Sequence, residues 1–437
     1  MSRRKGKMPS FQTQSKFGDH IESTVLDCGL PVMVVPKRDF RKTYALIGVN
    51  YGSINNHFKT SIAKGKQRVP DGIAHFLEHK MFEKKDGDVM EKFSQLGCSS
   101  NAMTSFNHTG YLFETTGPPE VGLELLVDFV TRPYFTEELV QKEKGIIGEE
   151  IKMYLDDPSW RGFMGVLEDL YPGHPLSIDI AGSLESIAEI KASDLQLCYD
   201  AFYTPPNMHL AVAGPIDPKT VAEIAERVIH RNGKDAPVAT ENFAAKVRRK
   251  PLKRRRKVLS PVTNQKLYLG IKILADELPN VDPVDLEIAL DIFLGAALGR
   301  SAPLYQELFR NGALDDSFGY SAYSEREYAF VMLSGDSPDA EALDRALCKG
   351  LTRCLDEGLA TADLRRQRRK SFGELVRSYD SMSSLCWNLI ECHAKGVDFA
   401  AYGDRVKALS NARIMEIARA ALRPDRFSAH YLIPNRG

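Results

Sequence analysis

The chain of 437 residues is long enough for two or three domains that each bury an apolar core. Lys plus Arg and Asp plus Glu number 58 each, so no overall charge points to nucleic acid or a membrane as a partner, and no apolar run reaches the roughly 18 residues of a membrane-spanning helix. Seven cysteines without a CxxC pair indicate reduced thiols in a cytoplasmic protein rather than a disulfide framework.

The beginning of the chain is basic, but no apolar segment follows it. We therefore expect residues 1–23 to be a flexible terminus rather than a signal peptide. Two apolar runs at residues 31–36 and 44–52, each bounded by turn residues, predict neighbouring strands of one sheet. The polar residues 55–69 predict a loop, after which a helix is expected to begin near Asp71 and Gly72.

This helix contains His75, Glu78 and His79. The two histidines are four residues apart and share one face of a helix, with Glu78 at the edge of that face. Paired imidazoles suit zinc, and an adjacent carboxylate can act as a general base. The order His-x-x-Glu-His reverses the common zinc motif His-Glu-x-x-His. A chance arrangement on an amphipathic helix is the alternative, and a third ligand downstream would argue against it.

Residues 136–155 predict a long helix that could supply this third ligand. Glu143 and Glu150 are two helical turns apart and share a face, whereas Glu149 is turned about 100° away. A catalytic zinc site needs three protein ligands. We choose Glu150 as the third ligand and Glu143 as a neighbour that orients a ligand. Without the histidines, a solvated helix face would be the preferred interpretation of both residues.

Residues 88–96 predict a helix ending at Gly97, and residues 99–116 predict two strands around a turn. We interpret His108 as an exposed residue at a strand end and His209, which alternates with apolar residues, as structural. The other elements predicted in the first half are helices at 119–131, 160–171, 185–202 and 219–229, and a strand at 208–214.

The composition changes at residues 231–261, where nine of the twelve residues 246–257 are basic. No aromatic side chain interleaves these charges, which disfavours nucleic-acid binding and favours a solvated linker or an acidic partner surface.

The second half then repeats the first, with strands and helices predicted at 266–273, 285–298, 317–335, 340–357 and 361–378. An offset of 225 residues places Gly148 on Gly373, but it also places Glu143 on Arg368 and Glu150 on Leu375.

The expected fold is therefore α+β, with two homologous domains that each form a mostly antiparallel sheet covered by helices. The expected boundaries are a flexible terminus at 1–23, a zinc-binding catalytic domain at 24–232, a basic linker at 233–261 and a homologous domain without a metal site at 262–437.

The segment His75-Phe76-Leu77-Glu78-His79, followed 71 residues after His79 by Glu150, resembles the pitrilysin, insulinase and mitochondrial processing peptidase family of zinc metallopeptidases. Further similar stretches begin at Asn101, Gly182 and Tyr203. The resemblance implies half of a clamshell peptidase that binds one Zn²⁺ per chain through His75, His79 and Glu150. It also implies that Glu78 is the catalytic base and that the edge strand with Asn101 and Ala102 receives the substrate as an added strand.

The functional hypothesis is a bacterial, cytoplasmic zinc endopeptidase that acts on peptides. Leader-peptide removal, degradation of free peptides and presequence cleavage all remain open as its task. The alternative is a non-catalytic family subunit that acts as a peptide-binding or assembly scaffold. Such subunits usually lose the His-x-x-Glu-His motif, which this chain keeps.

Dimeric relatives supply an Arg and a Tyr to the site of the partner from a stretch that resembles residues 304–315 of this chain. Phe309 stands where Arg is expected and Asp315 where Tyr is expected, so neither can donate a hydrogen bond to an oxyanion at neutral pH. Arg310 and Tyr320 are the nearest candidates to compensate. We therefore predict a heterodimer with a second family member that carries the Arg and Tyr, with a homodimer as the alternative and neither nucleic acid nor a membrane as a partner.

Overall fold

A computed structural model describes residues 10–234, 238–243, 247–252, 255–278 and 280–435. The chain forms two compact units, and each takes a segment from the other half of the sequence. The first unit contains the chain up to Ile151, Asp179–Phe243 and Val376–Ala400, and the second contains Lys152–Ile178, Ala244–Leu375 and the chain from Ala401 onward. The units therefore differ from a division into contiguous halves such as 24–232 and 262–437.

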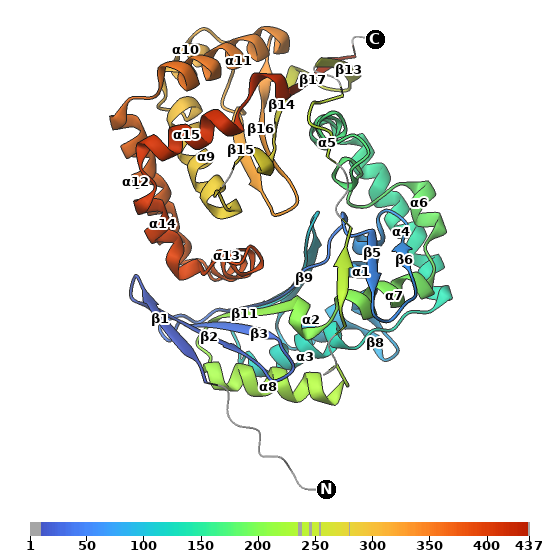
Figure 1. Cartoon of the computed structure of the whole chain (residues 1–437). Helices are drawn as coiled ribbons and strands as arrows, with labels where there is room; N and C mark the ends of the chain where they lie inside the picture. Colours follow the sequence, from blue (N-terminus) through green and yellow to red (C-terminus); the bar gives the residue numbers. More distant parts are fainter. Residues whose placement is uncertain (1–9, 235–237, 244–246, 253–254, 279, 436–437) are drawn as a thin grey trace, which may run out of the picture. The chain divides into compact units, whose positions relative to one another are not determined.

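The first unit is built on a seven-stranded sheet with the order β1-β2-β3-β11-β4-β10-β9 (Figure 1). All neighbours are antiparallel except β3 and β11. The strands are β1 (Gln12–Lys16), β2 (Asp19–Val25), β3 (Pro31–Pro36), β4 (Thr43–Val49), β9 (Ser99–Thr104), β10 (Thr109–Thr115) and β11 (Met208–Gly214). The strands predicted at 31–36 and 44–52 are present, but they are not neighbours because β11 lies between them. The prediction of a flexible terminus at 1–23 was wrong for residues 12–16 and 19–23, which form β1 and most of β2, whereas residues 1–9 lie outside the described residues.

The helices of this unit are α1 (Ile73–Phe82), α2 (Val89–Gln95), α3 (Glu120–Thr131), α4 (Glu137–Asp156), α6 (Leu184–Glu189), α7 (Ala192–Phe202), α8 (Pro218–Arg231) and α13 (Met382–Ala394). The end of α4 beyond Ile151 belongs to the second unit. Helices α3 and α8 cover one face of the sheet and α13 the other (Figure 1). The single helix predicted at 185–202 is interrupted, since α6 ends at Glu189 and α7 begins at Ala192.

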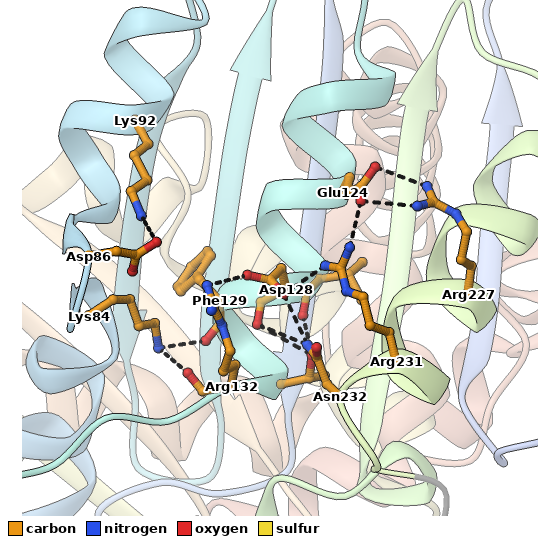
Figure 2. A network of polar contacts seen from close by, with 12 residues as sticks. Lys84, Asp86, Lys92, Glu124, Asp128, Phe129, Arg132, Arg227, Arg231 and Asn232 are labelled. Carbon is orange, nitrogen blue, oxygen red and sulfur yellow. Dashed lines mark hydrogen bonds and ion pairs between the residues drawn. The ribbon is translucent and has the colours of Figure 1, made fainter.

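A polar network joins α3 to α8 (Figure 2). Glu124 on α3 accepts two hydrogen bonds from the Arg227 guanidinium, at 3.0 and 2.9 Å, and Arg231 bonds to both Glu124 and Asp128. At the end of α3, the Lys84 ammonium group donates to the backbone carbonyls of Phe129 and Arg132. The network fixes the two helices that cover this face of the sheet.

The second unit repeats this arrangement with a five-stranded sheet in the order β13-β17-β14-β16-β15. Its strands are β13 (Arg255–Ser260), β14 (Gln265–Ile273), β15 (Gly319–Ser324), β16 (Ala329–Ser337) and β17 (Phe427–Pro434), and its helices are α5 (Pro158–Leu170), α9 (Pro283–Leu298), α10 (Pro303–Arg310), α11 (Ala340–Glu357), α12 (Thr361–Ser378), α14 (Tyr402–Ala408) and α15 (Asn411–Ala421). The parallel pair β13 and β17 corresponds to β3 and β11, and the other pairs are antiparallel in both sheets. The expected α+β fold with two homologous, mostly antiparallel units is confirmed.

The exchanged helices α13 and α5 pack on their sheets through glycines. An added Cβ on Gly110 of β10 would lie 2.4 Å from the Trp387 ring of α13, and one on Gly162 of α5 would lie 2.4 Å from the Tyr268 ring of β14. Only glycine permits these approaches without movement of the partner. Each sheet thus accepts a helix from the other half of the sequence.

The segment predicted as a basic linker contains two strands. β12 (Thr240–Asn242) pairs with β5 (His57–Thr60) in the first unit, and β13 forms the edge of the second sheet. Several of its basic side chains bind acidic partners within the second unit: Arg249 binds Asp276 and Glu277, Arg255 binds Asp344, Arg256 binds Glu168 and Asp169, and Lys257 binds Glu341. These ion pairs involve four of the basic side chains with carboxylates of the same unit, so the segment is not simply a solvated linker, and an acidic surface of a partner stays a prediction. Residues 246, 253 and 254 lie outside the described residues.

The polar segment 55–69 is not a loop, because it contains the hairpin strands β5 (His57–Thr60) and β6 (Lys66–Arg68). His108 is half-buried rather than exposed, and its ring lies 5.7 Å from that of Trp387. His209 is buried, as expected of a structural residue.

No single helix among the described residues is long and apolar enough to cross a membrane, although α9 and α10, bent by 43°, pass this test as a pair. Most of α9 is buried in the second unit, which is typical of a core helix.

Candidate metal centre

Helix α1 carries the His-x-x-Glu-His motif and is buried along nearly its whole length. It begins after Gly72, whose φ of 88° and close approach to the Ala181 carbonyl both require glycine. His75 and Glu78 are each 8% exposed and Lys80 is fully buried. Buried ionisable groups are costly unless they are paired, so their partners define the site.

The three predicted ligands converge. His75 Nε2 lies 3.6 Å from one oxygen of Glu150, and His79 Nε2 lies 3.5 Å from the other. One ligand atom from each of the three residues falls within 4.8 Å of the others, and this is the only such group of three found among the described residues. Two imidazole nitrogens and a carboxylate oxygen form a donor set that suits zinc and leaves a position open.

Glu143, on the same helix as Glu150, contacts His79. Its Oε1 lies 3.0 Å from His79 Nδ1, which leaves Nε2 directed toward Glu150. Its Oε2 accepts a hydrogen bond of 3.2 Å from Lys80 Nζ, which also pairs with Glu83. Lys80 was not predicted to take part in the site. A lysine inside the apolar face of a helix is an unusual residue that could have drawn attention to it.

Glu78 has a different partner. Its Oε2 accepts a hydrogen bond of 2.8 Å from the Thr104 hydroxyl on β9. Glu78 thus approaches the cluster from the same helix as the two histidines, but it is held by the sheet rather than by α4. Thr104 was also missed as a site residue, although it belongs to the stretch that begins at Asn101.

The surroundings shift the pKa values of the two histidines in opposite directions. Burial, together with the charge of His79, lowers the pKa of His75 to about 4. Burial also acts to lower the pKa of His79, but the hydrogen bond with Glu143 and the nearby carboxylates raise it above its ordinary value. Burial raises the pKa of Glu78, partly offset by the Thr104 hydroxyl. For Glu143, the effect of burial is outweighed by His79 and Lys80, which lower its pKa.

Strand β9, which carries Asn101 and Ala102, is an edge strand of its sheet, and among the described residues it pairs with β10 alone. At the turn, the Ser105 N–H donates to the His108 carbonyl, so by alternation the backbone groups of Thr104 and Ala102 point away from β10. The Ala102 N–H donates instead to Asn101 Oδ1 at 2.9 Å.

The predicted partner-facing stretch lies on and after α10 in the second unit. Phe309 is 42% exposed and stacks on Tyr305, while Asp315 is exposed. Arg310 is exposed, and Tyr320 is half-buried on β15.

Two repeated α+β units, of which one carries an imidazole and carboxylate cluster at the edge of its sheet, define a class of metallopeptidase-like proteins. The family model for insulinase (peptidase family M16) matches residues 67–183, and the model for the peptidase M16 inactive domain matches residues 189–371. The chain belongs to peptidase family M16.

Individual relatives agree with this membership. The uncharacterized zinc protease YmfH of Bacillus subtilis is 39% identical over 354 residues, which cover 81% of this chain and 82% of the relative. The crystal structure of an M16-like peptidase from Alicyclobacillus acidocaldarius has a TM-score of 0.90 and 31% identity, with 97% and 99% of the two chains covered. A protease from Helicobacter pylori shares the fold, with a TM-score of 0.78, 20% identity and coverage of 98% and 100%.

Proposed function

We propose that this chain is a zinc-dependent endopeptidase that cleaves peptides. The observation that carries the proposal is the convergence of His75, His79 and Glu150, with the carboxylate of Glu78 on the same helix. The name zinc protease borne by the Bacillus subtilis relative supports the same metal.

The residues present fit zinc. The two Nε2 atoms face the two oxygens of the Glu150 carboxylate, at 3.6 and 3.5 Å, and one ligand atom from each residue lies within 4.8 Å of the others. Two imidazole nitrogens and a carboxylate oxygen are ligands that zinc takes in catalytic sites. Glu143 would stay outside the ligand set and hold the His79 ring through Nδ1.

Bound zinc would polarise the scissile carbonyl and make a water molecule more acidic. Glu78 would accept a proton from the attacking water and later deliver it to the leaving amine. Burial raises the pKa of Glu78, which suits a group that must both take up and release a proton near neutral pH. His75, His79 and Glu150 would keep their positions throughout these proton transfers.

The substrate would bind as an added strand on β9. The backbone groups of Ala102 and Thr104 that point away from β10 would pair with the main chain of the peptide, which gives affinity with little demand on sequence. The Asn101 side chain occupies the Ala102 N–H, so an added strand would compete with it at that position.

The proposed partner is a second family member. Phe309 and Asp315 cannot donate hydrogen bonds to an oxyanion at neutral pH. In a homodimer, each zinc site would therefore lack the two hydrogen-bond donors that a partner is expected to supply. The test compares turnover by the purified chain alone with turnover after addition of candidate partners. Full turnover by the isolated chain, with self-association alone in size-exclusion chromatography, would contradict a heterodimer.

The proposed location is the cytoplasm, which is supported by seven cysteines that form no disulfide in the described part of the chain, three of them only half-buried.

Peptidase activity is tested with the zinc-loaded chain, the chelated chain and Glu78→Gln. We expect cleavage of an unstructured peptide that stops on chelation and returns with zinc. Glu78→Gln should retain zinc and lose turnover by about 10²–10⁴-fold, the usual contribution of a general base. Full activity of Glu78→Gln would reject the assignment. A chain that binds zinc but cleaves nothing, with or without a partner, would favour the non-catalytic scaffold.

A further inference from the structure

Thr104 is the last residue of β9, and its side chain and its backbone serve two different neighbours. The burial of β9 alternates, with Asn101 and Met103 exposed and Ala102 and Thr104 half-buried on the face that packs against α1. On that face the Thr104 hydroxyl donates to Glu78 Oε2 at 2.8 Å. The Thr104 backbone groups point to the edge of the sheet, where no other strand of the described part of the chain pairs with β9.

From this geometry we infer that Thr104 is a positioning residue that holds the Glu78 carboxylate at the point where the peptide main chain docks. The inference rests on the proposed peptidase function. The hydroxyl fixes Oε2 of Glu78 and leaves Oε1 as the oxygen that accepts the proton. Thr104 would therefore position the peptide through its backbone and the Glu78 base through its side chain.

The surroundings of Thr104 support a directed hydroxyl rather than an incidental contact. The neighbouring Thr109 hydroxyl donates to the Tyr51 carbonyl at 2.8 Å and lies 3.4 Å from the Thr104 oxygen. Because the single proton of Thr109 is directed to the Tyr51 carbonyl, the Thr109 oxygen at 3.4 Å is a more distant and neutral acceptor for Thr104 than the Glu78 carboxylate at 2.8 Å. A hydrogen bond to a charged group is stronger than one between neutral groups, so this contact can restrict the rotamers of Glu78.

The test uses Thr104→Val, which keeps the shape and removes the hydroxyl, and Thr104→Ser, which keeps the hydroxyl. Thr115→Val is the matched control, because Thr115 is a buried threonine on β10 whose hydroxyl bonds to the Gly97 carbonyl and the Gly117 N–H, and it lies about 20 Å along the strand from Thr109. For each variant we would measure kcat, KM, zinc affinity and a crystal structure of the metal-free chain.

We expect Thr104→Val to lower kcat by about 10–100-fold, less than loss of the base itself, with KM and zinc affinity unchanged. The Glu78 carboxylate should occupy a new rotamer or several. Thr104→Ser should restore most of kcat and the single rotamer, and Thr115→Val should leave kcat unchanged.

Wild-type kcat in Thr104→Val, or a single unchanged Glu78 rotamer, would overturn the inference while leaving the proposed function intact. A wild-type chain without peptidase activity would instead remove the function on which the inference rests. If Thr104→Val lost zinc or stability to the same extent as kcat, the role of Thr104 would be structural, which would also overturn the inference.

Discussion

Helices α1 and α9 hold the same place in the repeated topology, but their buried residues differ. Each comes after the strand that is third from one edge of its sheet, β4 or β14, and before the strand at that edge, β9 or β15. The buried residues of α9 are all apolar, whereas those of α1 include His75, Glu78 and Lys80. An apolar helix is sufficient for this fold. The ionisable residues of α1 therefore have a reason beyond stability, since burying them costs free energy.

The partner helices α4 and α12 differ in the same way. Arg368 stands in the place of Glu143 and bonds to Asn411 at 2.6 Å, and Leu375 stands in the place of Glu150 and is buried. The second unit thus keeps the helix without any ligand on it. The comparison indicates that the topology is independent of the metal centre.

The largest effect on stability should come from Lys80. Replacement by Met leaves the Glu143 and Glu83 carboxylates without their shared cation, and breaking a buried pair in this way costs about 3–5 kcal/mol. Urea unfolding of the metal-free chain at pH 8 measures this loss. The control is Lys272→Met in the second unit, where the fully buried lysine bonds to the Arg248 carbonyl and no carboxylate is left unpaired. Equal losses of unfolding free energy in the two variants would show that the ion pairs of Lys80 are not the cause of the destabilisation.

The second effect should be common to both units. Burial and the charge of Lys272 lower the pKa of His174 to about 4, and burial and the charge of His393 lower that of His209 to about 3. Between pH 6.5 and about 4 the unfolded chain takes up these protons and the folded chain does not, so stability falls as the pH falls. Each histidine should contribute on the order of 3 kcal/mol over this window.

Urea unfolding of the metal-free chain at a series of pH values tests this dependence. His209→Gln should reduce the pH dependence of the free energy of unfolding by the contribution of His209 and leave the contribution of His174. A free energy of unfolding that stays constant or rises on acidification would be incompatible with histidines that are buried in the neutral form.

The smallest effect concerns Glu143, which under the proposed function would influence zinc binding through His79. Glu143→Gln can still accept the His79 N–H but loses the charge that strengthens this bond. Loss of such an orienting partner weakens zinc binding by about 10–100-fold. Competition with a chromogenic chelator measures the change. Unaltered zinc affinity would mean that His79 is held by its own packing.

Much of the repeat could be predicted from periodicity. The strands at 31–36 and 208–214 and the helices at 340–357 and 361–378 have the predicted bounds, because each is a local pattern with clear ends. The position of α13 could not be predicted, since it depends on Gly48 and Gly110, which make room for Ile390 and Trp387 far along the sequence. The hairpin of β5 and β6 was missed because its residues are mostly polar.

In the metal site, too, contacts between separate elements could not be predicted from the sequence. Helical spacing identified His75, His79, Glu143 and Glu150 as candidates, and the structure places these residues together. The contacts of Thr104 with Glu78 and of Lys80 with Glu143 join separate elements, and spacing along one element carries no information about them.

Zinc titration of the wild-type chain, Glu150→Gln and Glu374→Gln tests the central claim most directly. Glu374 lies on α12 next to the position that corresponds to Glu150, and it is exposed. The account predicts one zinc per chain for the wild type and for Glu374→Gln. Loss of one of three ligands in Glu150→Gln should weaken binding by about a thousandfold, a third of a typical zinc binding energy. Two zinc ions per chain, or wild-type affinity in Glu150→Gln, would contradict a single metal centre in the first unit.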